Sequence, residues 1–130
     1  MNGELRNYLR YRLNERTFAG FISEESNDNF QFAQIVNMSR GGMCAYYVPM
    51  GKSAAVISHV SVFGRTDTLV RIENIPCKII YDIVMLTGGW SKLPEMRYGI
   101  EFLSQCSSQE KQIEDFIRDF ALHPYEGYGD

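Results

Sequence analysis

Apolar and polar positions along the chain predict a series of short strands followed by one helix. Residues 17–22 are small, β-branched or aromatic, and residues 30–36 alternate apolar with polar side chains at the period of a half-buried strand. An apolar run at residues 43–48 and alternation at residues 96–103 predict two more strands. The segment 52–67 fits either short strands or part of a helix.

A hairpin is predicted in the second half of the chain. Residues 68–72 and 75–86 both have the composition of strands, and the polar pair Glu73 and Asn74 between them suits a turn. The glycines and the proline of residues 87–94 then predict a loop. These elements continue the antiparallel pattern of the first half.

A helix is predicted after the last strand. Ser107, taken as the N-cap, stands three residues before Glu110, which is a spacing typical of a helix start. Four apolar residues then recur on one helical face: Ile113, Phe116, Ile117 and Phe120. We expect this face to cover the end of a barrel or sheet, and residues 123–130 to form a flexible tail.

The pattern as a whole predicts a mainly β fold of the α+β type, an antiparallel β-barrel with a C-terminal helix, because closing the sheet removes its exposed edges. The chain has 130 residues, the size of one domain, and its 45% of apolar and 22% of charged residues are ordinary for a globular protein. We therefore expect one core.

Charge restricts the class of partner. The net charge of -3 argues against a protein that coats nucleic acid, so neither DNA nor RNA is an expected partner. The arginines are nevertheless concentrated at the start of the chain: Arg6, Arg10, Arg12 and Arg16 lie in the first sixteen residues. This clustering predicts a local site for an anion.

Residues that could support catalysis or bind a metal do not occur at a known spacing. The three cysteines lack a CxxC pair and the two histidines are isolated, which predicts free thiols and no metal site. Ser39 lacks the first glycine of a GxSxG elbow, and the chain has no Walker loop. Without an apolar leader or spanning segment, we expect a cytoplasmic protein that inserts in no membrane, is no enzyme and needs no cofactor.

Two motifs indicate a binding site. Arg6 and Arg10 form an RxxxR ahead of the first predicted strand, and Asn37, Ser39 and Gly42 form an NxSxxG between two predicted strands. Guanidiniums offer planar arrays of donors, while the second motif offers an amide, a hydroxyl and a backbone without a side chain. Together they predict a site for a guanine nucleotide with phosphates.

Each motif also has a simpler interpretation. The RxxxR can be a solvated basic segment, and the NxSxxG can be a turn that uses its polar side chains locally. Arg12 and Arg16 form a second RxxxR, but a motif ending at Arg16 would overlap the first strand. We therefore assign Arg6 and Arg10, with Arg12 as an auxiliary contact. Trp90 suits a stacking role or a buried anchor.

In this order, and with these flanking strands, the motifs resemble the PilZ domain, the bacterial receptor module for cyclic di-GMP. The resemblance extends over nearly the whole chain, including the strand at residues 97–102 and the closing helix. It implies a six-stranded type of barrel over residues 13–122. It also implies a ligand site formed by Arg6, Arg10 and Arg12 from the N-terminal segment and by Asn37, Ser39 and Gly42, with Asn37 where many members have Asp.

The function that the resemblance implies is that of a receptor or adaptor. Cyclic di-GMP would be its ligand, and ordering of residues 1–12 would relay the level of this second messenger to an unidentified protein partner. An adaptor of the same fold that works without ligand is the alternative. Leu5 precedes the first motif arginine, where an arginine accompanies a stacked pair of nucleotides in the family, and this favours a single nucleotide.

Overall fold

The computed structural model describes residues 9–23, 29–47, 56–85, 95–103 and 106–124, and the structural statements below concern these residues. They form strands and one helix in the following order: β1 (Tyr11–Leu13), β2 (Thr17–Ser23), β3 (Asn29–Ser39), β4 (Gly42–Tyr47), β5 (Ile57–Arg65), β6 (Leu69–Met85), β7 (Glu95–Phe102), α1 (Ser107–Phe120) and β8 (Ala121–Pro124).

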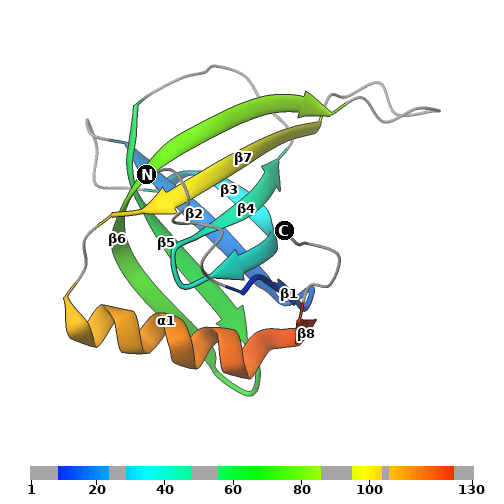
Figure 1. Ribbon diagram of the computed structural model, residues 1–130, viewed down its shortest axis with the longest axis vertical. Helices are drawn as coiled ribbons and strands as arrows, with labels where there is room; N and C mark the ends of the chain where they lie inside the picture. Colours follow the sequence, from blue (N-terminus) through cyan, green and yellow to red (C-terminus); the bar gives the residue numbers. More distant parts are fainter. Residues whose placement is uncertain (1–8, 24–28, 48–55, 86–94, 104–105, 125–130) are drawn as a thin grey trace.

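The strands close into an antiparallel barrel (Figure 1). The order β2-β5-β6-β7-β4-β3 is completed by pairing between β2 and β3, so each of these six strands has a partner on both sides. The short strands β1 and β8 pair with each other, and β1 also pairs with β3. The predicted six-stranded barrel with a C-terminal helix is confirmed.

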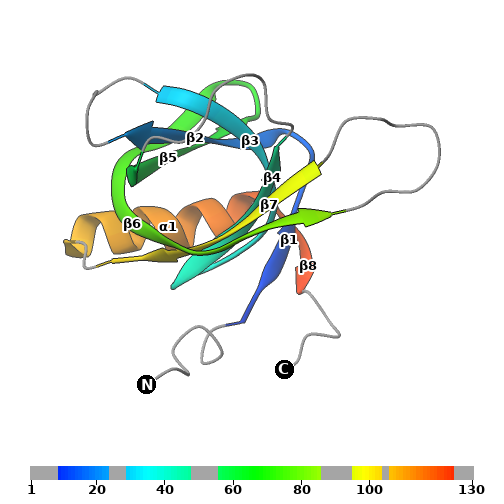
Figure 2. The same ribbon diagram turned by 90° about the horizontal axis from the view of Figure 1, so that it is seen from above.

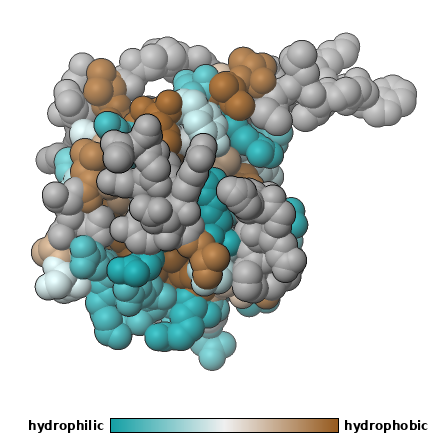
Figure 3. Space-filling model, in the orientation of Figure 1, coloured by the Kyte–Doolittle hydropathy of each residue, from teal (hydrophilic) through white to brown (hydrophobic). Residues whose placement is uncertain are grey.

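Helix α1 lies across one end of the barrel (Figure 2). Its buried residues are those predicted from helical spacing: Ile113, Phe116, Ile117 and Phe120. A Cβ built on Gly64 of β5 would lie 2.5 Å from the ring of Phe120, so this glycine lets the helix pack directly on a strand. The outer side of α1 is hydrophilic (Figure 3). Among the described residues, no helix is long and apolar enough to cross a membrane.

The helix begins one residue earlier than predicted, because Cys106 and not Ser107 is the N-cap. Cys106 has an extended backbone, and its carbonyl accepts bonds from the N–H groups of Gln109 and Glu110, each at 3.1 Å. Its side chain makes no capping bond. The backbone therefore determines where this helix starts, and the Ser-to-Glu spacing misled the prediction by one position.

The predicted hairpin at Glu73 and Asn74 is wrong, because β6 runs through both residues. Asn74 has φ of 59°, in the left-handed region that asparagine tolerates better than most residues. Its N–H donates to Oγ of Ser61 on β5 at 3.1 Å, so the irregularity is a bulge within a pair of strands. The segment left open at 52–67 contains β5.

The end of the chain continues further in regular structure than predicted. Strand β8 includes His123 and Pro124, the first residues of the predicted tail, and pairs with Tyr11 and Arg12 of β1. The backbone N–H of Asn14 also donates to the carbonyl of Phe120 at 3.0 Å. These contacts tie the chain before the barrel to the chain after the helix.

Candidate functional site

A row of paired residues crosses the outer face of the barrel. The strand register aligns Tyr81 of β6 with Gly99 of β7, Cys44 of β4, Asn37 of β3 and Arg12 of β1, in that order. Residues directly opposite each other in antiparallel strands project to the same face. The row therefore brings together Asn37 of the second motif, the auxiliary Arg12 and three residues that belong to neither motif.

A β-bulge in β3 turns Asn37 toward this outer face. Ala33 and Ile35 belong to the core, so strict alternation would point residue 37 inward as well. The register shifts between Ile35 and Asn37, and Met38 takes the core position instead. One extra residue in its strand therefore places the asparagine of the NxSxxG motif on the outer face of the sheet, although the residue itself is only 5% exposed.

A second bulge places Tyr81 in the same row. Cys77 belongs to the core and Ile79 packs against it, so alternation would also direct residue 81 inward. The register of β6 against β7 shifts between Ile79 and Tyr81. Tyr81 faces outward as a result and is 41% exposed.

The residues of the row other than Arg12 line a narrow hollow. It is lined by Arg10, Asn37, Gly42, Met43, Cys44, Ile80, Tyr81, Gly99 and Ile100. Its volume of about 20 Å³ corresponds to a single water molecule, so a nucleotide base does not fit between the strands. A ligand at this place must lie on the outer surface, over the hollow.

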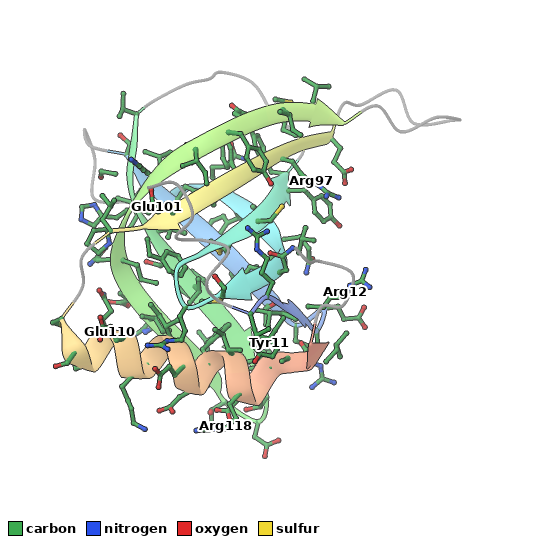
Figure 4. The ribbon with its side chains drawn as sticks, in the orientation of Figure 1. Tyr11, Arg12, Arg97, Glu101, Glu110 and Arg118 are labelled. Carbon is green, nitrogen blue, oxygen red and sulfur yellow. The ribbon has the colours of Figure 1, made fainter. Side chains whose placement is uncertain are left out.

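Both sequence motifs contribute to this hollow. Arg10 of the RxxxR lines it together with Asn37 and Gly42 of the NxSxxG, although these residues are far apart in the sequence. Arg12 is exposed on β1 next to Asn37 (Figure 4). Arg6 lies outside the described residues. Among the arginines that the structure describes, Arg10 and Arg12 therefore lie beside residues of the second motif.

Ser39 uses its hydroxyl within its own turn. Its Oγ accepts a hydrogen bond from the N–H of Gly41 at 3.1 Å and donates to the carbonyl of Gly42 at 3.4 Å. Ser39 is buried, which agrees with a part in holding the turn between β3 and β4. One acceptor lone pair of the hydroxyl is left for another donor. Turn stabilisation and ligand contact are compatible at this residue.

Arg40 forms an ion pair with the closing helix. Nε of Arg40, in the turn after β3, lies 3.2 Å from a carboxylate oxygen of Glu114 on α1. Both side chains are about half exposed, so this ion pair contributes under about 1 kcal/mol. Trp90 lies outside the described residues.

Sequence analysis missed Tyr81, Cys44 and Arg97 as members of this region. The hydroxyl of Tyr81 donates to Sγ of Cys44 at 3.6 Å. Burial and this hydrogen bond raise the pKa of Tyr81 to about 12, while the guanidiniums of Arg10 and Arg97 act in the opposite direction. An available signal was Gly99, because a glycine inside a strand often marks a close approach.

No group of His, Cys, Asp and Glu among the residues with described positions is arranged to hold a metal ion. The groups that the hollow offers are guanidinium, amide and backbone donors, an aromatic ring and a thiol. Such groups bind an anionic, hydrogen-bonding ligand by contact and charge.

The antiparallel six-stranded barrel with a C-terminal helix matches the fold of solved PilZ domain structures. The PilZ domain of YcgR from Escherichia coli, solved with c-di-GMP, matches with a TM-score of 0.66 and 17% identity, over 88% of this chain and 90% of that one. YcgR from Escherichia coli in complex with c-di-GMP matches at 0.60 and 18%, over 88% and 45%. The MrkH–c-di-GMP complex from K. pneumonia matches at 0.65 and 15%, over 88% and 50%.

This chain spans about half the length of the latter two chains. No protein-family model matches the sequence, and no curated protein matches it. At these identities, the likeness to the solved structures shows the fold. The PilZ-like fold expected from the two motifs is thus confirmed by a comparison that does not use them.

Proposed function

We propose that this chain is a receptor for cyclic di-GMP. The observation that carries the proposal is the meeting of Arg10 with Asn37 and Gly42 around one hollow on the outer face of the barrel. The guanidinium can neutralise a phosphate or donate to a guanine edge, and the asparagine can both donate and accept there. The structures of YcgR and MrkH with c-di-GMP support the choice of ligand, because they share this fold.

The receptor would act without catalysis of its own. Arg6, Arg10 and the auxiliary Arg12 would hold the phosphates and one base, and Asn37 and Gly42 would contact a base above β3 and β4. Ligand binding would order the segment before β1 and so change the surface presented to a protein partner. Such a shift is limited by the difference in ligand affinity between the two arrangements. The alternative is an adaptor that binds its partner without ligand.

Calorimetry with cyclic di-GMP on the purified chain tests the proposal. We expect saturable binding that weakens as salt is added, because charged contacts contribute to it. Absence of heat, together with absence of competition at tens of micromolar ligand, would favour the ligand-independent adaptor.

We expect the ligand to slow amide hydrogen exchange ahead of β1. Tyr11 and Arg12 already pair with β3 in this structure, so the increase in protection should fall in residues 4–10. Hydrogen exchange with and without cyclic di-GMP measures it, and the barrel strand β5 serves as the internal reference. Equal protection of residues 4–10 in both conditions would place the proposed relay elsewhere.

Replacing Asn37 by alanine is expected to weaken cyclic di-GMP binding about 5- to 150-fold. The loss is that expected when one polar group of the ligand is left without its hydrogen-bond partner. The Asn37→Asp variant is the matched comparison, because an acidic residue at this position fits the PilZ pattern and should retain binding. Calorimetry gives the affinities and circular dichroism checks the fold. If Asn37→Ala binds as tightly as the wild type, the asparagine belongs to the turn and not to the ligand site.

A further inference from the structure

The ring of Tyr81 lies directly on the backbone of the neighbouring strand. A Cβ built on Gly99 would approach the ring carbons Cε2, Cδ2 and Cζ of Tyr81 at 2.1, 2.5 and 2.5 Å. Real side chains do not come this close, so only glycine at position 99 leaves room for the ring. The aromatic side chain thus crosses β7 instead of pointing away from the sheet.

The far end of the ring is anchored on the next strand. The hydroxyl of Tyr81 donates to Sγ of Cys44 on β4 at 3.6 Å, so the side chain reaches from β6 over β7 to β4. With one side of the ring on Gly99 and its hydroxyl bonded, Tyr81 still keeps 41% of its surface exposed. The exposed part is the side of the ring that faces away from the barrel.

Two guanidiniums flank this ring. Arg10 lines the hollow beside it, and Arg97 precedes Gly99 by two residues on β7 (Figure 4). Nε of Arg97 is buried and has no hydrogen-bond partner among the described residues. The positive charges of Arg10 and Arg97 both act to lower the pKa of Tyr81, so both guanidiniums lie near this side chain.

A flat aromatic surface between two arginines fits a purine base with acceptors on its edge. Base stacking on an aromatic side chain contributes to nucleic-acid binding at many sites, and guanine offers O6 and N7 to arginine donors. A phosphate would suit the arginines but would gain nothing from the ring. The ring therefore distinguishes the position of a base from that of a phosphate.

We propose that Tyr81 is the stacking surface for one guanine of cyclic di-GMP, with the guanidinium of Arg97 near that base. This inference rests on the proposed function and adds a base subsite that neither sequence motif contains. Gly99 is a positioning residue for the ring. The second motif and Arg10 would then hold the ligand from the other side of the hollow.

Calorimetry with cyclic di-GMP on ring variants tests the subsite. Tyr81→Phe keeps the stacking surface and should bind within about twofold of the wild type, whereas Tyr81→Leu should lose about 5- to 150-fold in affinity. Gly99→Ala should cause a similar loss, because the added methyl displaces the ring. Phe32→Leu is the control, since Phe32 is 55% exposed on β3 but lies outside the row.

A spectroscopic measurement separates stacking from a structural effect. In the wild type and in Tyr81→Phe, the H8 proton of one bound guanine should shift upfield by the ring current, and this shift should disappear in Tyr81→Leu measured at saturating ligand. An unchanged shift in Tyr81→Leu, or wild-type affinity of that variant, would overturn the subsite. If the wild type itself binds no cyclic di-GMP, both the receptor function and the subsite are wrong.

Discussion

Replacing Arg10 by alanine is expected to weaken cyclic di-GMP binding by about 2–4 kcal/mol, a loss of roughly 30- to 1000-fold. Arg10 lines the hollow with Asn37 and Gly42, so its guanidinium would face the phosphates or the base of a ligand at this place. Truncation leaves the partner charge of the ligand without its counter-ion in a partly desolvated contact. Calorimetry at fixed salt measures the change.

Arg16→Ala is the matched control and also tests the alternative RxxxR. Arg16 lies in the turn before β2, where its backbone carbonyl accepts from the N–H of Arg65 at 3.1 Å, and it does not line the hollow. We expect Arg16→Ala to bind cyclic di-GMP within a few-fold of the wild-type affinity. Any small loss should disappear when salt is added, because salt screens long-range charge interactions. A large loss in Arg16→Ala with none in Arg10→Ala would mean that the second RxxxR is the binding motif.

Replacing Phe116 by alanine is expected to lower the free energy of unfolding by about 3–5 kcal/mol. The side chain is 1% exposed between α1 and the end of the barrel, and its ring lies 4.6 Å from that of Phe120. The change removes buried apolar surface and leaves a cavity that a closed barrel cannot readily fill. Urea unfolding followed by circular dichroism measures it.

Phe32→Ala is the control for this stability prediction. Phe32 is 55% exposed on the outer side of β3, and its ring makes an edge contact with Phe18 at 6.1 Å. Replacing this phenylalanine by alanine should lower the free energy of unfolding by less than about 1 kcal/mol. A loss below about 1 kcal/mol in Phe116→Ala would show that the packing of this ring contributes little to the stability of the barrel.

The general form of the fold could be read from the sequence because it depends on periodicity. Alternation at 30–36 and 96–103 and the apolar runs at 17–22 and 43–48 predicted strands that the structure contains. The helical spacing from Ile113 to Phe120 predicted the buried face of α1 correctly. In each case a regular element buries one face, so its pattern repeats along the chain and is visible without tertiary information.

The candidate site was only partly predictable. The two motifs indicated Arg10, Asn37 and Gly42, which the structure brings together. They did not indicate Tyr81, because its role depends on a glycine that is distant in sequence and on the pairing of β6 with β7. A contact across strands leaves no local spacing to recognise.

Sequence by itself determined the class of fold and the chemistry of the two motifs, because periodicity and residue type are local properties. The tertiary structure decided which side chains share a surface. A one-residue register shift turns Asn37 outward in β3, another does the same for Tyr81 in β6, and a left-handed Asn74 keeps β6 continuous where a turn was expected. A single extra residue reverses the face of every position that follows it, and such a residue is identified only by its unpaired place in the sheet.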